Sequence, residues 1–116
     1  MELLPLAAAA LLGNVDVSAQ VVLSFSGDFE RHTIQYQCEG LEQPLAVDFI
    51  NASPNFLALV PIGPQKLVFV SVESASGVKY VSGQYEFWTK GSDATLADLQ
   101  SSDNTPHPCA EITETP

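Results

Sequence analysis

The chain has 116 residues, of which 14 are acidic and only 4 are basic, so its formal net charge at pH 7 is −10. A chain of this length forms one hydrophobic core, and we expect a single folded domain. The charge argues against nucleic acid as a partner, because binding phosphates requires clusters of Lys and Arg. It equally disfavours attachment to an anionic membrane surface. A cationic partner is the natural complement, although acidity also serves solubility alone.

Residues 1–19 have features of an export signal and lie outside the expected domain at residues 20–116. The apolar run Leu3–Leu12 is too short to span a bilayer, and small residues precede a cleavage site after Ala19. The positively charged start of such signals is missing, because Glu2 follows the initiator Met directly. We therefore expect an incomplete export signal and a periplasmic protein, with a retained apolar strand as the alternative.

Short β-branched and aromatic runs follow, separated by Gly, Pro, Asn and Ser, and they predict strands. After an apolar run at 20–26, the alternation at 31–38 is typical of a half-buried strand with His32, Ile34, Tyr36 and Cys38 on its inner face. Further strands are expected at 45–50, 56–62 and 66–72, and residues 94–99 form either a last strand or a short helical turn. From Gln100 we expect a polar loop up to Cys109 and a loose tail after it.

A β-hairpin is expected around the pair Ser82-Gly83, because Gly tolerates the positive φ of tight hairpin turns. A two-residue loop there would place Val81 opposite Gln84, Tyr80 opposite Tyr85, Lys79 opposite Glu86 and Val78 opposite Phe87. The same geometry brings Ser76 and Lys90 to one end of the hairpin, on loops outside the core. Seven or eight such strands predict an all-β fold, either a small antiparallel barrel or a sandwich.

Two motifs lie in this hairpin region: S-G-x-x-Y, which begins at Ser76, and Y-x-F-W-x-K-G, which ends at Gly91. A Y-x-C motif ends at Cys38, and Cys109 stands alone near the end of the chain. This set resembles the signature of the bacterial inhibitors of C-type lysozyme, in both the membrane-bound and the periplasmic branch. The resemblance implies an antiparallel barrel of eight strands. The absence of a Cys near Ala19 favours the periplasmic branch.

The resemblance also implies which residues meet the enzyme. Ser76 and Lys90 would enter the lysozyme cleft and contact its two catalytic carboxylates, blocking the cleft and neutralising the acid/base pair. The other motif residues would support these two: Gly77 and Gly91 would set the loop backbones, and aromatic side chains would hold them rigid. The supporting residues are Gly77, Tyr80, Tyr85, Phe87, Trp88, Thr89 and Gly91.

The two cysteines have two interpretations. In an exported protein Cys38 and Cys109 are expected to form a disulfide. With His32 and His107 they are also the ligand types of tetrahedral zinc, although their spacing matches no compact zinc finger. We expect the disulfide, and neither a metal nor a cofactor.

Catalytic motifs such as G-x-S-x-G, H-E-x-x-H and a Gly-rich phosphate loop are missing from the sequence, so we expect no enzyme activity. Two other functions stay open. One is a barrel that carries an apolar small molecule in the cell envelope, which would require a large dry cavity. The other is a structural module of an envelope assembly. The sequence predicts no membrane span, and it leaves open the oligomeric state and which lysozyme is the target.

Overall fold

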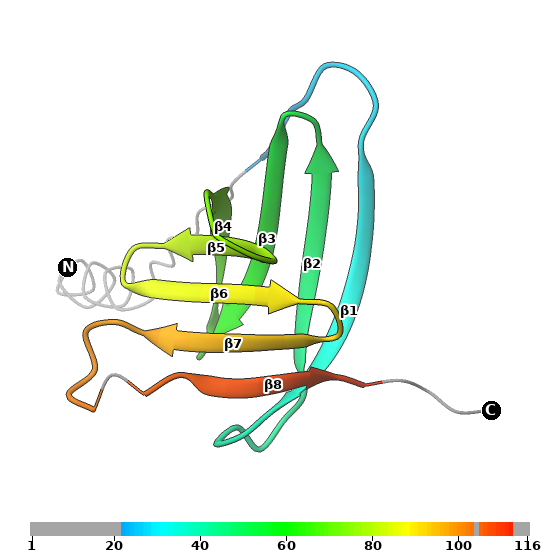
Figure 1. Cartoon of the computed structure of the whole chain (residues 1–116). Helices are drawn as coiled ribbons and strands as arrows, with labels where there is room; N and C mark the ends of the chain where they lie inside the picture. Colours follow the sequence, from blue (N-terminus) through cyan, green and yellow to red (C-terminus); the bar gives the residue numbers. More distant parts are fainter. Residues whose placement is uncertain (1–21, 104, 113–116) are drawn as a thin grey trace, which may run out of the picture.

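The computed structural model describes residues 22–103 and 105–112, and in these parts of the chain eight strands form a closed antiparallel barrel (Figure 1). The strands are β1 (Glu30–Cys38), β2 (Leu45–Ala52), β3 (Asn55–Ile62), β4 (Gln65–Val72), β5 (Val78–Ser82), β6 (Tyr85–Lys90), β7 (Asp93–Asp98) and β8 (His107–Glu111). Each strand pairs with the next, and β1 closes the barrel on β8. This architecture confirms the predicted all-β barrel.

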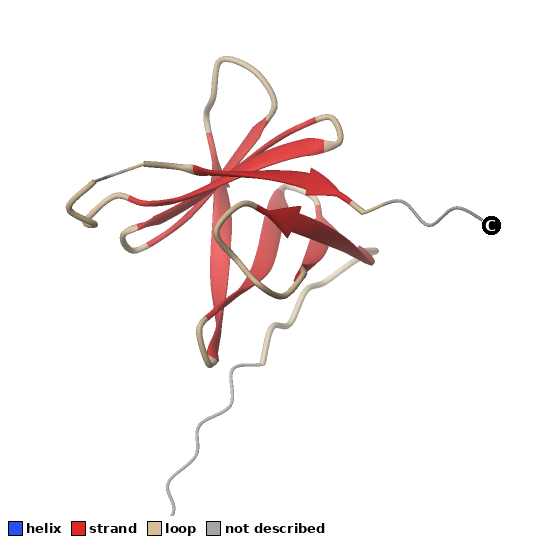
Figure 2. Ribbon diagram, turned by 90° about the horizontal axis from the view of Figure 1, so that it is seen from below, coloured by secondary structure: helices blue, strands red, loops and turns tan. Residues whose placement is uncertain are grey.

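The strands fall into two groups that cross at a steep angle. Figure 1 shows β1, β2 and β3 running past the shorter strands β6, β7 and β8, and Figure 2 shows the crossing from below. The expected export signal at residues 1–19 lies outside the described residues. In the described part of the chain, no helix has the length and apolar character needed to cross a membrane.

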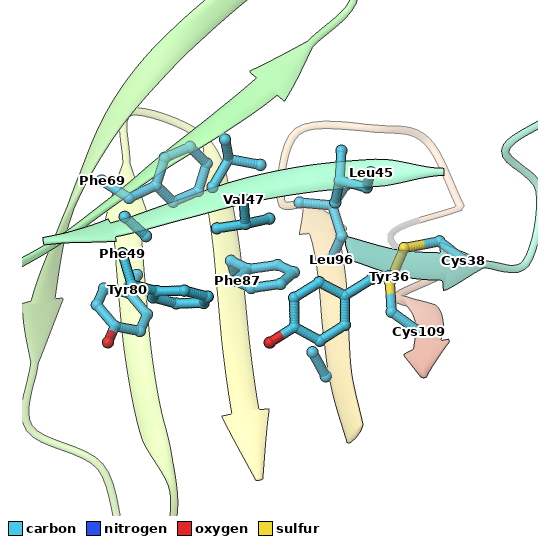
Figure 3. Packing of buried hydrophobic residues seen from close by; sticks show 13 residues of the cluster. Tyr36, Cys38, Leu45, Val47, Phe49, Phe69, Tyr80, Phe87, Leu96 and Cys109 are labelled. Atoms are coloured by element: carbon cyan, nitrogen blue, oxygen red, sulfur yellow. A yellow bond between two sulfur atoms is a disulfide. The ribbon is translucent and has the colours of Figure 1, made fainter. Parts of the chain in front are cut away.

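Alternating side chains fill the barrel with aromatic rings (Figure 3). Tyr36, Phe69 and Phe87 are at most 1% exposed. The ring of Tyr36 meets that of Phe87 edge-on, with centroids 5.3 Å apart, and Phe49 lies 5.6 Å from Tyr80. Burial raises the pKa of Tyr36 to about 12, and nearby Glu111 and Tyr80 add to the effect, so the Tyr36 phenol stays neutral at physiological pH.

The disulfide Cys38–Cys109 joins the two strands that close the barrel. The sequence separation of 71 residues makes this link worth about 4 kcal/mol on the chain-entropy account. The register of β1 and β8 places the two cysteines directly opposite each other. Both sulfur atoms are therefore committed to the disulfide, and the alternative of a zinc site that uses them is excluded.

The prediction of a polar loop and loose tail around Cys109 was wrong, because His107–Glu111 is strand β8. Only Cys109 of its five residues is buried, so the segment lacks the apolar alternation that marks a strand. It is a strand because β1 and β7 flank it and offer backbone partners on both sides. Of the two options for residues 94–99, the strand is confirmed as β7. The apolar run at 20–26 forms no strand over its described residues, 22–26.

The hairpin of β5 and β6 forms, but the predicted pairing was displaced by two residues. Ser82 lies opposite Tyr85, so the loop is Gly83-Gln84 rather than Ser82-Gly83. Tyr80 consequently faces Phe87, and Lys79 faces Trp88. A displacement of two residues keeps every side chain on its predicted face. Lys79 and Glu86 still form an ion pair, now diagonal, with Nζ and Oε2 3.7 Å apart.

His32 lies on the same side of β1 as Ile34 and Tyr36, as predicted, but its side chain is exposed and not buried in the core. Its ring stacks on that of Phe49 at a centroid distance of 5.5 Å. The reason is its position near the start of β1, where it covers the end of the core instead of entering it.

On the outer face of the barrel, Asp48 connects three strands. Its carboxylate accepts hydrogen bonds from the Thr33 hydroxyl and from Arg31 Nη2, the latter at 3.2 Å, and Lys66 Nζ lies 3.5 Å away. The Asp48 side chain is only 8% exposed. The hydrogen bond from Thr33, followed by those charges, holds the pKa of Asp48 below its usual range. Asp48 thereby links β2 to β1 and β4, and it forms ion pairs with two of the four basic side chains.

Replacing Asp48 by Asn should lower the free energy of unfolding at pH 7 by about 1–3 kcal/mol, because it removes the charge that Arg31 and Lys66 share. A carboxyl with a lowered folded-state pKa contributes stability above its unfolded-state pKa, and this contribution is lost as the pH falls through the folded-state value. The difference between wild type and D48N should therefore shrink in acid. Urea denaturation at pH 7 and pH 3 measures it, with exposed Asp28→Asn as the control. A difference that is the same at both pH values would contradict the role of the charge.

Candidate functional site

Ser76 and Lys90 lie at the same end of the β5–β6 hairpin, and both are exposed. Ser76 is in the loop between β4 and β5, and Lys90 is the last residue of β6. Gly77 brings the two together. A Cβ atom there would collide with the Thr89 carbonyl oxygen and would lie 2.7 Å from Lys90 Cγ. The loop backbone therefore rests directly on the end of β6.

Trp88 holds both residues in place. Its indole Nε1–H donates a hydrogen bond of 2.7 Å to the carbonyl oxygen of Ser76. The ammonium nitrogen of Lys90 lies 4.1 Å from the centroid of the same ring, and that of Lys79 lies 4.2 Å from it. Such cation–π contacts hold a long side chain against a flat surface without neutralising its charge. One indole thus fixes the loop on one side and the lysine on the other.

The position of Trp88 follows from the alternation of β6. Phe87, its neighbour, is 0% exposed and packs in the core, so the Trp88 side chain must point outward. The two aromatic residues therefore serve opposite faces of the strand. Tyr80 is buried beneath the site and also belongs to the core. Tyr85 lies at the other end of the hairpin, opposite Ser82, and the structure does not bring it to the site.

The loop itself is held by internal hydrogen bonds. The Ser74 hydroxyl lies within donating distance of two carbonyl oxygens, 3.1 Å from that of Ser76 and 3.0 Å from that of Gly77. It has one hydrogen and serves one of them at a time. The Thr89 hydroxyl donates to the carbonyl oxygen of Val78 at 3.3 Å. The sequence analysis missed Ser74, although hydroxyl side chains that bond to the backbone two residues on are a known signal of such turns.

Lys90 differs from the other three basic residues in what it contacts. Arg31 and Lys66 meet Asp48, and Lys79 meets Glu86. Among the described residues, no carboxylate lies within 4.0 Å of the Lys90 ammonium group. Lys90 is exposed, and its charge and its three hydrogen-bond donors are thus not taken up by a carboxylate of the described residues, in a protein whose net charge is −10.

The residues of the site are suited to binding a partner that carries carboxylates. The site presents an ammonium and a hydroxyl, two donors suited to carboxylates. Gly91, with φ of +61° and open space around it, leaves the turn after Lys90 unobstructed. In the described residues no group of three His, Cys, Asp or Glu side chains is arranged to hold a metal ion. His107 lies elsewhere, with Nδ1 2.9 Å from the carbonyl oxygen of Glu39.

Comparison with known proteins identifies related chains. Residues 36–105 match the family described as membrane-bound lysozyme-inhibitor of c-type lysozyme. The protein of that name from Pseudomonas aeruginosa is 43% identical over 83 residues, which are 68% of this chain and 65% of that protein. The one from Cupriavidus necator is 41% identical over 71 residues, 61% of this chain and 56% of that one. The chain thus spans less than two thirds of the length of these relatives.

A solved structure is similar in fold. It is the crystal structure of Pseudomonas aeruginosa MliC in complex with hen egg white lysozyme, with a TM-score of 0.66 and 39% sequence identity. The match covers 83% of this chain and all of the solved chain. At this identity the barrel, and not only a local motif, is shared between the two proteins.

Replacing Gly77 by Ala should disturb the site more than the same change at Gly83. Both glycines have positive φ, +66° and +56°, so each substitution costs about 1–3 kcal/mol of backbone strain. Only at Gly77 does the new Cβ also collide with β6, whereas Gly83 has open space. Urea denaturation should show a larger loss of stability for G77A. Trp88 is the sole tryptophan, so its fluorescence should shift in G77A and not in G83A. Equal effects of the two changes would contradict the close packing of loop and strand.

Proposed function

The chain belongs to the family of membrane-bound lysozyme inhibitors of C-type lysozyme, and from this we propose that it inhibits a C-type lysozyme by placing Ser76 and Lys90 in the active-site cleft. The family is one of inhibitors, not enzymes.

The observation that carries the proposal is the shared support of Ser76 and Lys90 by one indole ring. The cleft of such a lysozyme contains two carboxylates, one a protonated general acid and one ionised. The ammonium group of Lys90 suits the ionised carboxylate, and the hydroxyl of Ser76 suits its neighbour. Because Trp88 already holds the Ser76 backbone and the Lys90 ammonium, less conformational entropy is lost on binding than a free loop and a free lysine would lose.

The charge of the chain supports the same partner. A protein with a net charge of −10 is attracted to a basic protein such as lysozyme, and the attraction accelerates encounter. The acidic cleft of the enzyme would repel an acidic inhibitor unless the part that enters the cleft carries a positive charge. Lys90 supplies that cation at the tip of the hairpin, so the overall field and the local charge suit different regions of the same enzyme.

The alternative of a small-molecule carrier has less support. A carrier barrel keeps an internal cavity for its ligand. Here the interior is occupied by the buried rings of Tyr36, Phe69 and Phe87, which pack against each other and against the aliphatic core. An apolar ligand would have to displace these side chains, at the cost of the packing that stabilises the barrel.

Lys90→Ala should weaken binding to hen egg white lysozyme by about 2–5 kcal/mol, because the lysozyme carboxylate is left without its ion partner. Ser76→Ala should cost about 1 kcal/mol, as expected for one hydrogen bond. Titration into a cell-wall lysis assay, together with calorimetry, measures both. Lys66→Ala is the matched control, since it removes the same charge from a remote part of the barrel. If K90A and K66A inhibit equally well, the proposed role of Lys90 is wrong.

The family name places its members at the cell envelope, and we propose the periplasm as the site of action, with cleavage after Ala19. The small residues before Gln20 and the short apolar run support this. Expressed in a Gram-negative host, the chain should be recovered from the periplasmic extract with Gln20 as its first residue. Edman sequencing or intact mass measures this. Recovery in the membrane fraction with residues 1–19 attached would overturn the proposal.

A further inference from the structure

A groove of about 840 Å³ opens beside the Ser76 loop, where β4 ends and β5 begins. Three apolar side chains line it and are unusually exposed: Phe56 is 40% exposed, Val72 41% and Val78 40%. They come from β3, β4 and β5, which are neighbours in the sheet. Exposed apolar side chains gathered in a concave surface are typical of a contact site rather than of a solvated face.

The groove and the candidate site share a wall. Ser74 and Gly77 line the groove, and Ser76, between them in the chain, accepts a hydrogen bond from Trp88. The loop that lines the groove is therefore also the loop held to the ring on which Lys90 rests. The edge of a cleft that admits Ser76 would lie next to the groove.

We propose that this groove is a second contact surface for the same lysozyme molecule and takes an apolar side chain from the edge of its cleft. The inference rests on the proposed function and adds a partner surface to it. Once the edge covers Phe56, Val72 and Val78, water is excluded from the groove beside the Ser76 loop. The attraction between Lys90 and a carboxylate is stronger in such a dry surrounding.

Charge identifies the occupant as a basic protein. Glu73 lies in the rim of the groove and is exposed, and the whole chain carries −10. A second copy of the chain would bring the same net charge, and a two-fold contact through the groove would direct Glu73 of each copy toward the other. Like charges so placed oppose association. A basic partner instead meets an apolar floor with an acidic rim.

The test compares two valines on one strand. Val70 and Val72 are both on β4 and are 46% and 41% exposed, but only Val72 lines the groove. Val72→Ser and Val78→Ser should each raise the Kd for hen egg white lysozyme about fivefold, mainly through faster dissociation, because about 1 kcal/mol of apolar burial is lost. Val70→Ser should leave the Kd within about twofold. Surface plasmon resonance gives the rates, and thermal melting confirms that all three variants fold.

The outcomes separate this inference from the proposed function. If the wild-type chain does not inhibit lysozyme, the proposed function fails, and this inference fails with it. If the wild type inhibits and V72S and V78S bind as tightly as V70S, only the groove proposal is overturned. If V72S instead converts a dimer to a monomer in sedimentation and leaves lysozyme affinity unchanged, the groove belongs to a second copy, and the proposal is equally overturned.

Discussion

The alternation of β6 is the constraint on which both the core and the candidate site depend. Phe87 is 0% exposed and meets the ring of Tyr36 inside the barrel, and its neighbour Trp88 is consequently outside. A slip of β6 by one residue would exchange the two and lose both functions. The outward indole then carries the Ser76 carbonyl oxygen and the Lys90 ammonium. The packing of Phe87 in the core thus fixes the outward position of its neighbour Trp88, and Trp88 in turn holds the surface residue Lys90.

The distribution of the four basic residues gives the site its electrostatic character. Arg31 and Lys66 are held by Asp48 on the outer face of β2, and Lys79 is held by Glu86. These ion pairs balance the charges of three basic side chains within the protein itself. Lys90 rests on an aromatic ring instead and keeps its charge available. A strongly acidic protein can in this way present a cation to a partner without weakening the field that attracts that partner.

The sequence was sufficient to predict what depends on local pattern. Strand faces follow from alternation, so Tyr36 could be assigned to the inner face of its strand, and Phe87 and Trp88 to opposite faces of theirs, although the pattern did not decide which of the two enters the core. The turn glycines Gly77 and Gly83 placed Ser76 and Lys90 at one end of the hairpin. The exact pairing was displaced by two residues, because alternation limits the register only to steps of two and the loop position decides among them.

What the sequence did not predict depends on neighbours that are distant along the chain. Strand β8 contains Pro108 and a single buried residue, Cys109, and it is a strand because two other strands pair with it. The carboxylate of Asp48 meets partners from β1 and β4, which no spacing in the sequence reveals. The same holds for the groove of Phe56, Val72 and Val78. All three features depend on which strands come to lie side by side, and that arrangement is a property of the whole barrel.

The Ser76 loop lines the groove and is bonded to Trp88, whose ring carries Lys90, so a charge and an apolar surface lie close together. Transferring an ammonium group from water into a cleft costs desolvation free energy, which a single ion pair recovers only in part. Lys90 loses less than a free lysine does, because the Trp88 ring already covers part of its stem and charge. Apolar burial in the adjoining groove would supply further free energy without a desolvation cost. A protein that binds through a charged group therefore gains the most binding free energy when an apolar contact surface lies beside that group. The close approach of the Gly77 backbone to the end of β6 places Lys90 and the groove at one loop.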